Sequence, residues 1–255
     1  MRGFCDSWRL VRPLNYVMHS PGVLTRICQC MLINGALFLG SLIIFNCIIL
    51  SFLKKITGNE YVETTFGLLF NLLWLYPVYV MSFVLTTLWV QDIFDASFKH
   101  FYGNKYRPLQ ALSLPQLISY LLNRIIMIGF FQIQSSLFSL LPFPFGKLLF
   151  FIHCSLLHSY YCFEYITAAL NMRLKTTIEI FEYNWAYFIG FGLSFTMIIL
   201  KWPGMISSGI FCFLFPFLVL TSVPAEINLN KRRGIRLPIF TVSLYLTNKL
   251  FKLIC

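Results

Sequence analysis

The chain has 255 residues, of which 58% are hydrophobic and only 11% are charged. Because soluble globular domains carry about 25% charged residues, this composition excludes an ordinary soluble protein and predicts several membrane-embedded segments. The formal net charge is +11, but the basic residues are spread over short segments between apolar runs. This distribution argues against nucleic acid as a partner and favours the lipid bilayer and its anionic headgroups.

Long apolar runs predict an all-α, polytopic membrane protein. A span needs about 20 mostly apolar residues, and six runs approach this length: Cys28–Leu53, Phe66–Val90, Leu117–Leu141, Lys147–Leu170, Ala186–Leu200 and Met205–Ser222. Pro77 lies inside the second run and is expected to kink it. The predicted division is therefore a cytosolic N-terminal segment 1–27, a helical membrane domain 28–222 and a basic tail 223–255.

The distribution of lysine and arginine predicts that both termini face the cytosol. With six spans, the segments on the side of the termini hold 15 of the 20 Lys and Arg residues, whereas the opposite loops hold 4. Cytosolic loops of membrane proteins are enriched in these residues. Charged residues also interrupt the stretch 1–27, so no cleavable signal peptide is expected there.

The fifth run is short for a full span. Its 15 residues would cover roughly 22 Å as a helix, less than a hydrocarbon core of about 30 Å. Trp185 and Trp202 could extend it into the interfaces, or residues 186–222 could form a re-entrant hairpin that turns at KWPG (201–204). LPFPFG (141–146) raises the same question. A re-entrant hairpin would argue for a homo-oligomer or a cavity, because irregular backbone at depth must be covered by protein or water.

The tail combines a basic cluster with an amphipathic segment. NKRRGIR (230–236) supplies Lys231, Arg232, Arg233 and Arg236 as candidate contacts for anionic lipid headgroups, each worth about 1 kcal/mol near the surface. If residues 239–254 are helical, one arc holds Thr241, Tyr245, Asn248, Lys249 and Lys252, and the opposite arc holds Ile239, Leu246, Leu250, Leu253 and Ile254. Such a helix is expected to lie in the membrane interface, although a seventh span is the alternative.

Two charged residues lie within apolar runs, and their depths match. Arg124 is about 10 to 11 Å into the third run, and Glu164 is about 9 Å into the fourth run from the same side. A lone charge in a bilayer costs several kcal/mol, and pairing removes much of that cost. We therefore predict an intramembrane ion pair that holds two antiparallel helices in register. A proton or anion site at this pair, or separate snorkelling of each charge, are the alternatives.

Other polar features have structural interpretations that we prefer to functional ones. His158 is expected to donate or accept a hydrogen bond with a neighbouring helix, and Asn34, Asn46, Asn71 and Asn123 are candidates for the same role. Asp92 and Asp95 suggest a solvated helix end, with Lys99 as a candidate partner. Gly190 and Gly192 favour close helix packing, with an anion-binding cradle at a helix start as the alternative.

No pattern typical of catalysis is present. The sequence lacks a nucleophile elbow, a phosphate-binding loop and a zinc-protease helix. The eight cysteines show no metal-ligand spacing. We therefore expect no catalytic, cofactor-binding or metal-binding residue, and we predict that the chain is not an enzyme.

Four stretches resemble the etoposide-induced protein 2.4 family: RICQCMLINGALF (26–38), LWLYPVYVMSFVLTTLWVQDIFD (73–95), LLHSYYCFEY (156–165) and NWAYFIGFG (184–192). The most specific positions are Trp89, Gln91, Asp92, Tyr161, Cys162, Phe163, Glu164, Asn184 and Trp185. The likeness is strongest to the nematode-type members, which are linked to ectopic P granules and autophagy. The resemblance implies a multi-pass protein of the endoplasmic reticulum membrane, required for macroautophagy at the maturation of autophagosomes into degradative autolysosomes.

The resemblance has further implications. Animal members are also linked to apoptosis, and autophagy-related protein partners are expected. Distant bacterial relatives are sulfate-uptake membrane proteins with hemi-penetrating helices, which makes an anion transporter or channel the alternative function. No established catalytic residue of the family can be carried over. Ala186 and Ser194 stand where family members tend to have proline, so the break before the fifth helix is expected to be soft.

Overall fold

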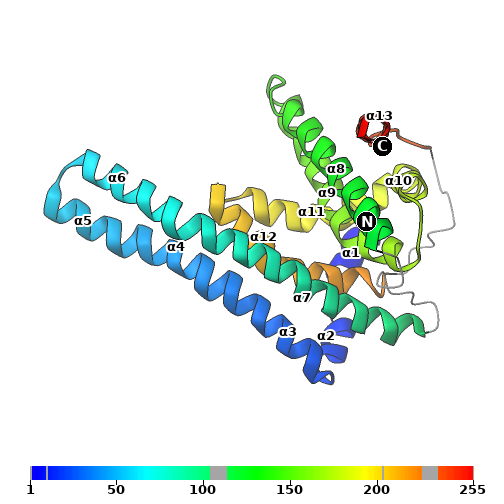
Figure 1. The fold of residues 1–255 in the computed structure, drawn as a ribbon, viewed down its shortest axis with the longest axis horizontal. Coiled ribbons are helices and arrows are strands. Elements are labelled where there is room, and N and C mark those ends of the chain that lie inside the picture. The colour runs from blue at the N-terminus through cyan, green and yellow to red at the C-terminus, as the bar shows by residue number, and fades with distance from the viewer. Residues whose placement is uncertain (1, 10, 104–113, 203, 226–234, 255) are drawn as a thin grey trace. The chain divides into compact units, whose positions relative to one another are not determined.

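The computed structural model describes residues 2–9, 11–103, 114–202, 204–225 and 235–254, and the regular elements among them are all helices (Figure 1). The all-α prediction is therefore confirmed for the described residues. Two compact units are formed, and neither is a continuous stretch of chain. Unit 1 comprises Met1–Pro13, Ser97–Met197 and Val219–Cys255, and unit 2 comprises Leu14–Ala96 and Ile198–Leu218.

Unit 2 is built around a long helical hairpin (Figure 1). Its first arm joins α3 (Pro21–Met31), η1 (Leu32–Leu39), α4 (Gly40–Ile44), η2 (Phe45–Ile49) and α5 (Leu50–Thr57), and its second arm joins α6 (Glu60–Phe70), η3 (Asn71–Leu75) and α7 (Tyr76–Tyr102). Gly58 ends the first arm in the left-handed conformation, with φ 55°, which glycine adopts at little cost. Asn59 then caps α6 by accepting a hydrogen bond from the Tyr61 N–H at 3.0 Å. The short helix α2 (Val11–Met18) precedes the hairpin.

Polar contacts tie the two arms together. The buried Asn34 amide donates to Thr86 at 2.7 Å and accepts from Ser82, so the predicted interhelical role is confirmed at this position. Asn46 instead donates to the Leu42 carbonyl of its own arm. Near the open end, Arg26 pairs with Asp92 at 3.1 Å, so Asp92 meets a cation from the other arm and not the expected Lys99.

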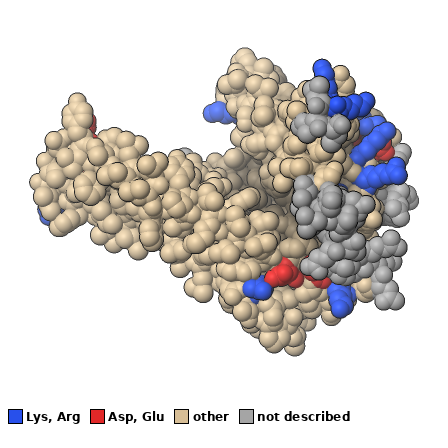
Figure 2. Space-filling model, viewed as in Figure 1, with Lys and Arg blue, Asp and Glu red and all other residues tan. Residues whose placement is uncertain are grey.

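The second arm runs through Pro77 without ending. A π-helical turn, Asn71–Leu75, lies directly before α7, and helix irregularities of this kind are typical next to proline. Figure 2 shows the visible face of the hairpin as almost entirely uncharged between its ends. Exposed apolar side chains on the arms include Ile44, Phe52, Leu72 and Leu88.

Three described helices are long and apolar enough to cross a membrane: Pro21–Thr57 (37 residues), Glu60–Tyr102 (43 residues) and α12, Gly204–Ser222 (19 residues). Helices α10 (Leu174–Tyr183) and α11 (Trp185–Leu200) are together long and apolar enough to cross as well. They are bent by 88° relative to each other, so they would count as a fourth span only as one broken span. These helices coincide with the first, second, fifth and sixth predicted runs. The break before α11 is sharp, contrary to the soft break expected from Ala186. The chain turns at KWPG, between Leu200 and Gly204.

The third and fourth runs form helices at the predicted places. They are α8 (Leu114–Phe138) and α9 (Phe145–Ala169), and neither is among the helices that meet the criteria for a span. The segment 171–185, predicted only as a cytosolic connection, contains α10, which the sequence analysis missed.

Unit 1 places α9 at its centre. Most of α9 is buried, and it packs antiparallel to α8 across a turn at residues 139–144 (Figure 1). Aromatic side chains fill the core: Phe181 stacks on Phe188 with ring centroids 3.7 Å apart, and Phe131 stacks on Phe240 at 4.2 Å. The C-terminal helix α13 (Thr241–Ile254) packs against α8. This confirms the helix predicted over residues 239–254.

Candidate functional site

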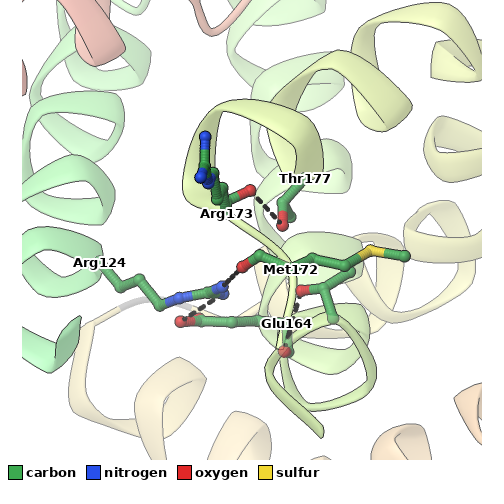
Figure 3. Close-up of polar contacts among 6 residues, drawn as sticks. Arg124, Glu164, Met172, Arg173 and Thr177 are labelled. Atoms are coloured by element: carbon green, nitrogen blue, oxygen red, sulfur yellow. Dashed lines mark hydrogen bonds and ion pairs between the residues drawn. The ribbon is translucent and has the colours of Figure 1, made fainter. Parts of the chain in front are cut away.

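The predicted partners Arg124 and Glu164 lie in ion-pair contact (Figure 3). Arg124 Nη1 is 3.4 Å from Glu164 Oε1, and Arg124 Nη2 donates to the Met172 carbonyl at 3.2 Å. Equal depth on antiparallel helices brings the two residues together, as the spacing predicts. The Arg124 side chain is only 3% exposed, so it does not snorkel to the surface. The guanidinium therefore binds one carboxylate and one carbonyl, both supplied by α9 and the turn that follows it.

This third partner makes the ion pair unsymmetrical. A simple pair would tolerate exchange of its charges. Here, the double exchange Arg124→Glu with Glu164→Arg would aim a carboxylate at the Met172 carbonyl. Two acceptors would then face each other in a buried place, which is unfavourable.

Glu164→Gln is expected to lower the free energy of unfolding by about 3 kcal/mol, and Arg124→Gln by about 1 to 2 kcal/mol. Glu164→Gln leaves a guanidinium charge in a buried place, whereas Arg124→Gln leaves a carboxylate whose side chain is 21% exposed. The double exchange is expected to recover only part of the loss. Reversible unfolding in mixed micelles measures all three variants. Full recovery by the double exchange would contradict the role given to Met172.

A second buried carboxylate, Glu182 on α10, holds the C-terminal segment. Its side chain is 0% exposed. Arg236 donates to its Oε2 from Nε at 2.7 Å and from Nη2 at 2.7 Å. The Phe240 N–H and the Thr241 hydroxyl donate to its Oε1 at 3.1 and 3.0 Å. We call these four residues the tail clasp.

The sequence analysis missed the tail clasp and gave Arg236 another role. Arg236 was expected to contact lipid headgroups, but the structure places it on Glu182. The hydrogen bond to Glu182, and then the charge of Glu182, raise the pKa of Arg236 above its ordinary value, so this cation stays protonated. The other three candidate headgroup contacts, Lys231, Arg232 and Arg233, lie outside the described residues.

Further polar contacts fix α13 on α8. Gln134 donates to the Ile239 carbonyl at 3.0 Å and accepts from the Ser243 hydroxyl at 2.9 Å. Its amide nitrogen also lies 3.4 Å from His153 Nε2. On the next helix pair, His158 Nδ1 lies 2.7 Å from the Thr196 hydroxyl, which confirms the hydrogen bond expected between helices at His158.

The two glycines, Gly190 and Gly192, lie inside α11 and allow close packing. A Cβ added at Gly192 would collide with the Ser155 carbonyl of α9, and one added at Gly190 would lie 3.3 Å from the Phe4 nitrogen of α1 (Arg2–Ser7). Both glycines lie beyond the first turn of α11, so they are not placed to form the anion-binding cradle at a helix start that was the alternative. The N-terminal helix is further fixed by a hydrogen bond from the Tyr187 hydroxyl to Asp6 at 3.0 Å.

The motif residues of the sequence analysis are distributed over both units. Trp89, Gln91 and Asp92 lie on α7 in unit 2, where Gln91 donates to Asp95 at 2.8 Å. Unit 1 holds the others: Tyr161, Cys162, Phe163 and Glu164 on α9, and Asn184 and Trp185 at the bend between α10 and α11. Phe163 is fully buried, with edge contacts to Phe188 and Phe191. The motif therefore marks packing and polar contacts of the helices.

A helical fold with several membrane-spanning candidates and paired buried charges defines a polytopic membrane protein. Residues 9–225 match the family described as "Sulfate transporter CysZ/Etoposide-induced protein 2.4". The chain belongs to this family, as its motifs indicate.

Curated relatives agree with this assignment. The chain is 28% identical to "Protein EI24 homolog" of Arabidopsis thaliana, with 87% of this chain and 81% of that protein covered. It is 26% identical to "Protein EI24 homolog" of Dictyostelium discoideum, with 98% and 83% covered. "Ectopic P granules protein 4" of Caenorhabditis elegans is 32% identical over 60% of this chain and 48% of that protein. No solved structure matches significantly.

Proposed function

We propose that the chain is a non-catalytic scaffold of the endoplasmic reticulum membrane that acts in macroautophagy, where autophagosomes mature into degradative autolysosomes. Family membership supports this role, as does likeness to a relative named for ectopic P granules. We further propose that both termini face the cytosol and that autophagy-related proteins bind the cytosolic segments.

The observation that favours a scaffold is the pairing of buried charges. Apart from histidines, three acidic or basic side chains are buried among the described residues: Asp6, Arg124 and Glu182. Each has an opposite charge within 4 Å, at 3.3 Å from Arg9, 3.4 Å from Glu164 and 2.7 Å from Arg236, respectively. A buried charge that is already neutralised holds helices together and is poorly suited to binding a solute ion.

Cells that lack the chain test the proposal. We expect autophagic substrates to persist and immature autophagosomes to accumulate, with clearance restored by re-expression of the wild-type chain. Delivery of an autophagic substrate to lysosomes is the measurement. Normal delivery in the deficient cells would overturn the autophagy role.

Anion transport is the second candidate, because the family description includes a sulfate transporter. Arg124 is the buried cation that could attract sulfate. Its contacts with Glu164 and the Met172 carbonyl reduce its ability to do so, and for this reason we place transport second.

A further inference from the structure

The rotation of α13 about its axis is set by polar side chains. Ser243 and Thr247 are 1% and 0% exposed and face α8, where Ser243 donates to Gln134 at 2.9 Å. The Phe240 ring, 1% exposed, stacks on Phe131 just before α13 begins. The tail clasp holds the first turn at Thr241. Contacts at several points therefore fix which side of α13 points away from unit 1.

That outward side carries apolar and basic side chains beside the exposed polar residues Thr241 and Asn248. Val242, Tyr245 and Leu246 are 58%, 63% and 39% exposed. Lys249 and Lys252 are exposed on the same side, since residues three, four and seven apart share a helical face. We call Val242, Tyr245, Leu246, Lys249 and Lys252 the outer face. The sequence has no Asp or Glu after Glu226, so positive charge on this face is not balanced nearby along the chain.

The outer face includes Tyr245, Lys249 and Lys252 of the predicted polar arc, which is exposed as expected, but it also carries the apolar side chains of Val242 and Leu246. Helical periodicity assigns Tyr245 to a polar arc and places Leu250 on the apolar arc that would enter the membrane. In the structure, Leu250 is only partly exposed, whereas Tyr245 is among the most exposed residues of α13. Small hydroxyl side chains take the buried side, because they allow close approach of helices and can donate hydrogen bonds.

The position of α13 suits a membrane surface. Figure 1 shows α8 from the side and α13 nearly end-on, so the two helices cross steeply. The tip of the α8–α9 hairpin exposes Leu140, Phe143 and Phe145 at 79%, 76% and 71%. This tip lies about 10 Å beyond Gln134, the residue that contacts α13. The tip and the outer face of α13 are therefore two exposed surfaces of unit 1 with apolar side chains, as expected where a membrane protein contacts lipid.

We propose that the outer face of α13 is a docking surface for anionic lipid. Its apolar side chains enter the headgroup boundary, and Lys249 and Lys252 meet lipid phosphates and carboxylates, as in other interfacial basic helices. The tail clasp and Gln134 orient this face before lipid binds. The inference rests on the chain being a membrane protein and does not depend on the proposed role in autophagy.

Photo-crosslinking of the full chain in vesicles tests this orientation. The photoreactive amino acid p-benzoylphenylalanine is placed in turn at positions 242, 245 and 250. We expect lipid adducts at 242 and 245, and crosslinks within the protein at 250. Lipid adducts at 250 without adducts at 245 would restore the face predicted from sequence and overturn the proposal. If the probe at position 245 crosslinks only to a second protein chain, the outer face binds a protein partner, and the proposal is also overturned.

The charge requirement is tested with the probe kept at position 245. In phosphatidylcholine vesicles that also contain phosphatidylserine, the ratio of phosphatidylserine adducts to phosphatidylcholine adducts is measured. Vesicles without phosphatidylserine are the comparison. The double change Lys249→Gln with Lys252→Gln is expected to lower this ratio, by about fivefold for each lysine that contacts an anionic headgroup. The matched control is Lys54→Gln with Lys55→Gln, at the turn of the hairpin in unit 2, which should leave the ratio unchanged. An equal ratio in both double variants would show that the outer face does not select anionic lipid.

Discussion

Arg236→Gln is expected to free the C-terminal helix and to lower the free energy of unfolding of unit 1 by about 3 kcal/mol. The arginine is 41% exposed, but its partner Glu182 is 0% exposed, so the substitution leaves a carboxylate charge without its cation in a buried place. The remaining donors are the Phe240 N–H and the Thr241 hydroxyl. Hydrogen exchange of the α13 amides is the direct readout, because release of the clasp exposes them.

A double-mutant cycle separates loss of the cation from loss of packing. Glu182→Gln removes the buried charge and keeps the shape, so Glu182→Gln with Arg236→Gln is expected to be more stable than Arg236→Gln alone. Lys175→Gln, at an exposed position of the same helix α10, is the matched control and should change stability by less than about 0.5 kcal/mol. Unchanged α13 exchange in Arg236→Gln would mean that other contacts hold the tail.

Gly192→Ala is expected to destabilise unit 1 by about 2 to 3 kcal/mol, although alanine is the better helix former. The new Cβ would collide with the backbone carbonyl of Ser155 and lie 2.9 Å from the Ser159 hydroxyl. A backbone atom in the middle of a buried helix cannot rotate away, so α9 and α11 must separate. Thermal unfolding and the yield of monodisperse protein in detergent measure the effect.

The control for this prediction is Gly129→Ala on α8. A Cβ added at Gly129 meets nothing within 4 Å, so the same substitution there should stabilise the helix by up to about 1 kcal/mol. The two variants therefore have opposite expected signs. Stabilisation by both would contradict the close packing of α11 on α9.

The sequence predicts contacts that follow from counting along connected helices. Arg124 and Glu164 lie on consecutive antiparallel helices, so their distances from a shared turn fix their relative height. Their preference for each other then follows from the cost of a lone charge. The third partner, Met172, could not be predicted, because it depends on how the chain bends after α9.

Features set by tertiary packing were missed. Helix α10 carries Lys175, Glu179 and Glu182, and its charges made residues 171–185 look like a connection. A signal was present, since Glu182 shares a helical face with Ile178 and Phe181, which are both buried. An acidic residue on an apolar face indicates a buried partner, but the sequence does not show that this partner is Arg236, 54 positions away.

The exposed side of α13 could be predicted, but not what its other side contacts. All five residues of the predicted polar arc are exposed, whereas Leu250 of the apolar arc lies on the side that packs toward α8. Ser243 and Thr247 share that buried side, where Ser243 donates a hydrogen bond to Gln134. Periodicity identifies an amphipathic helix, whereas the side that packs inward depends on what its neighbour offers.

Sulfate flux tests most directly the central claim that buried charges in this chain hold helices together and do not move ions. Purified wild-type protein is reconstituted into vesicles, and the uptake of labelled sulfate is compared with that of protein-free vesicles. The scaffold account predicts equal rates in both. Saturable uptake that requires the protein and is lost in a folded Arg124→Gln variant would contradict it, and would make Arg124 part of an anion pathway.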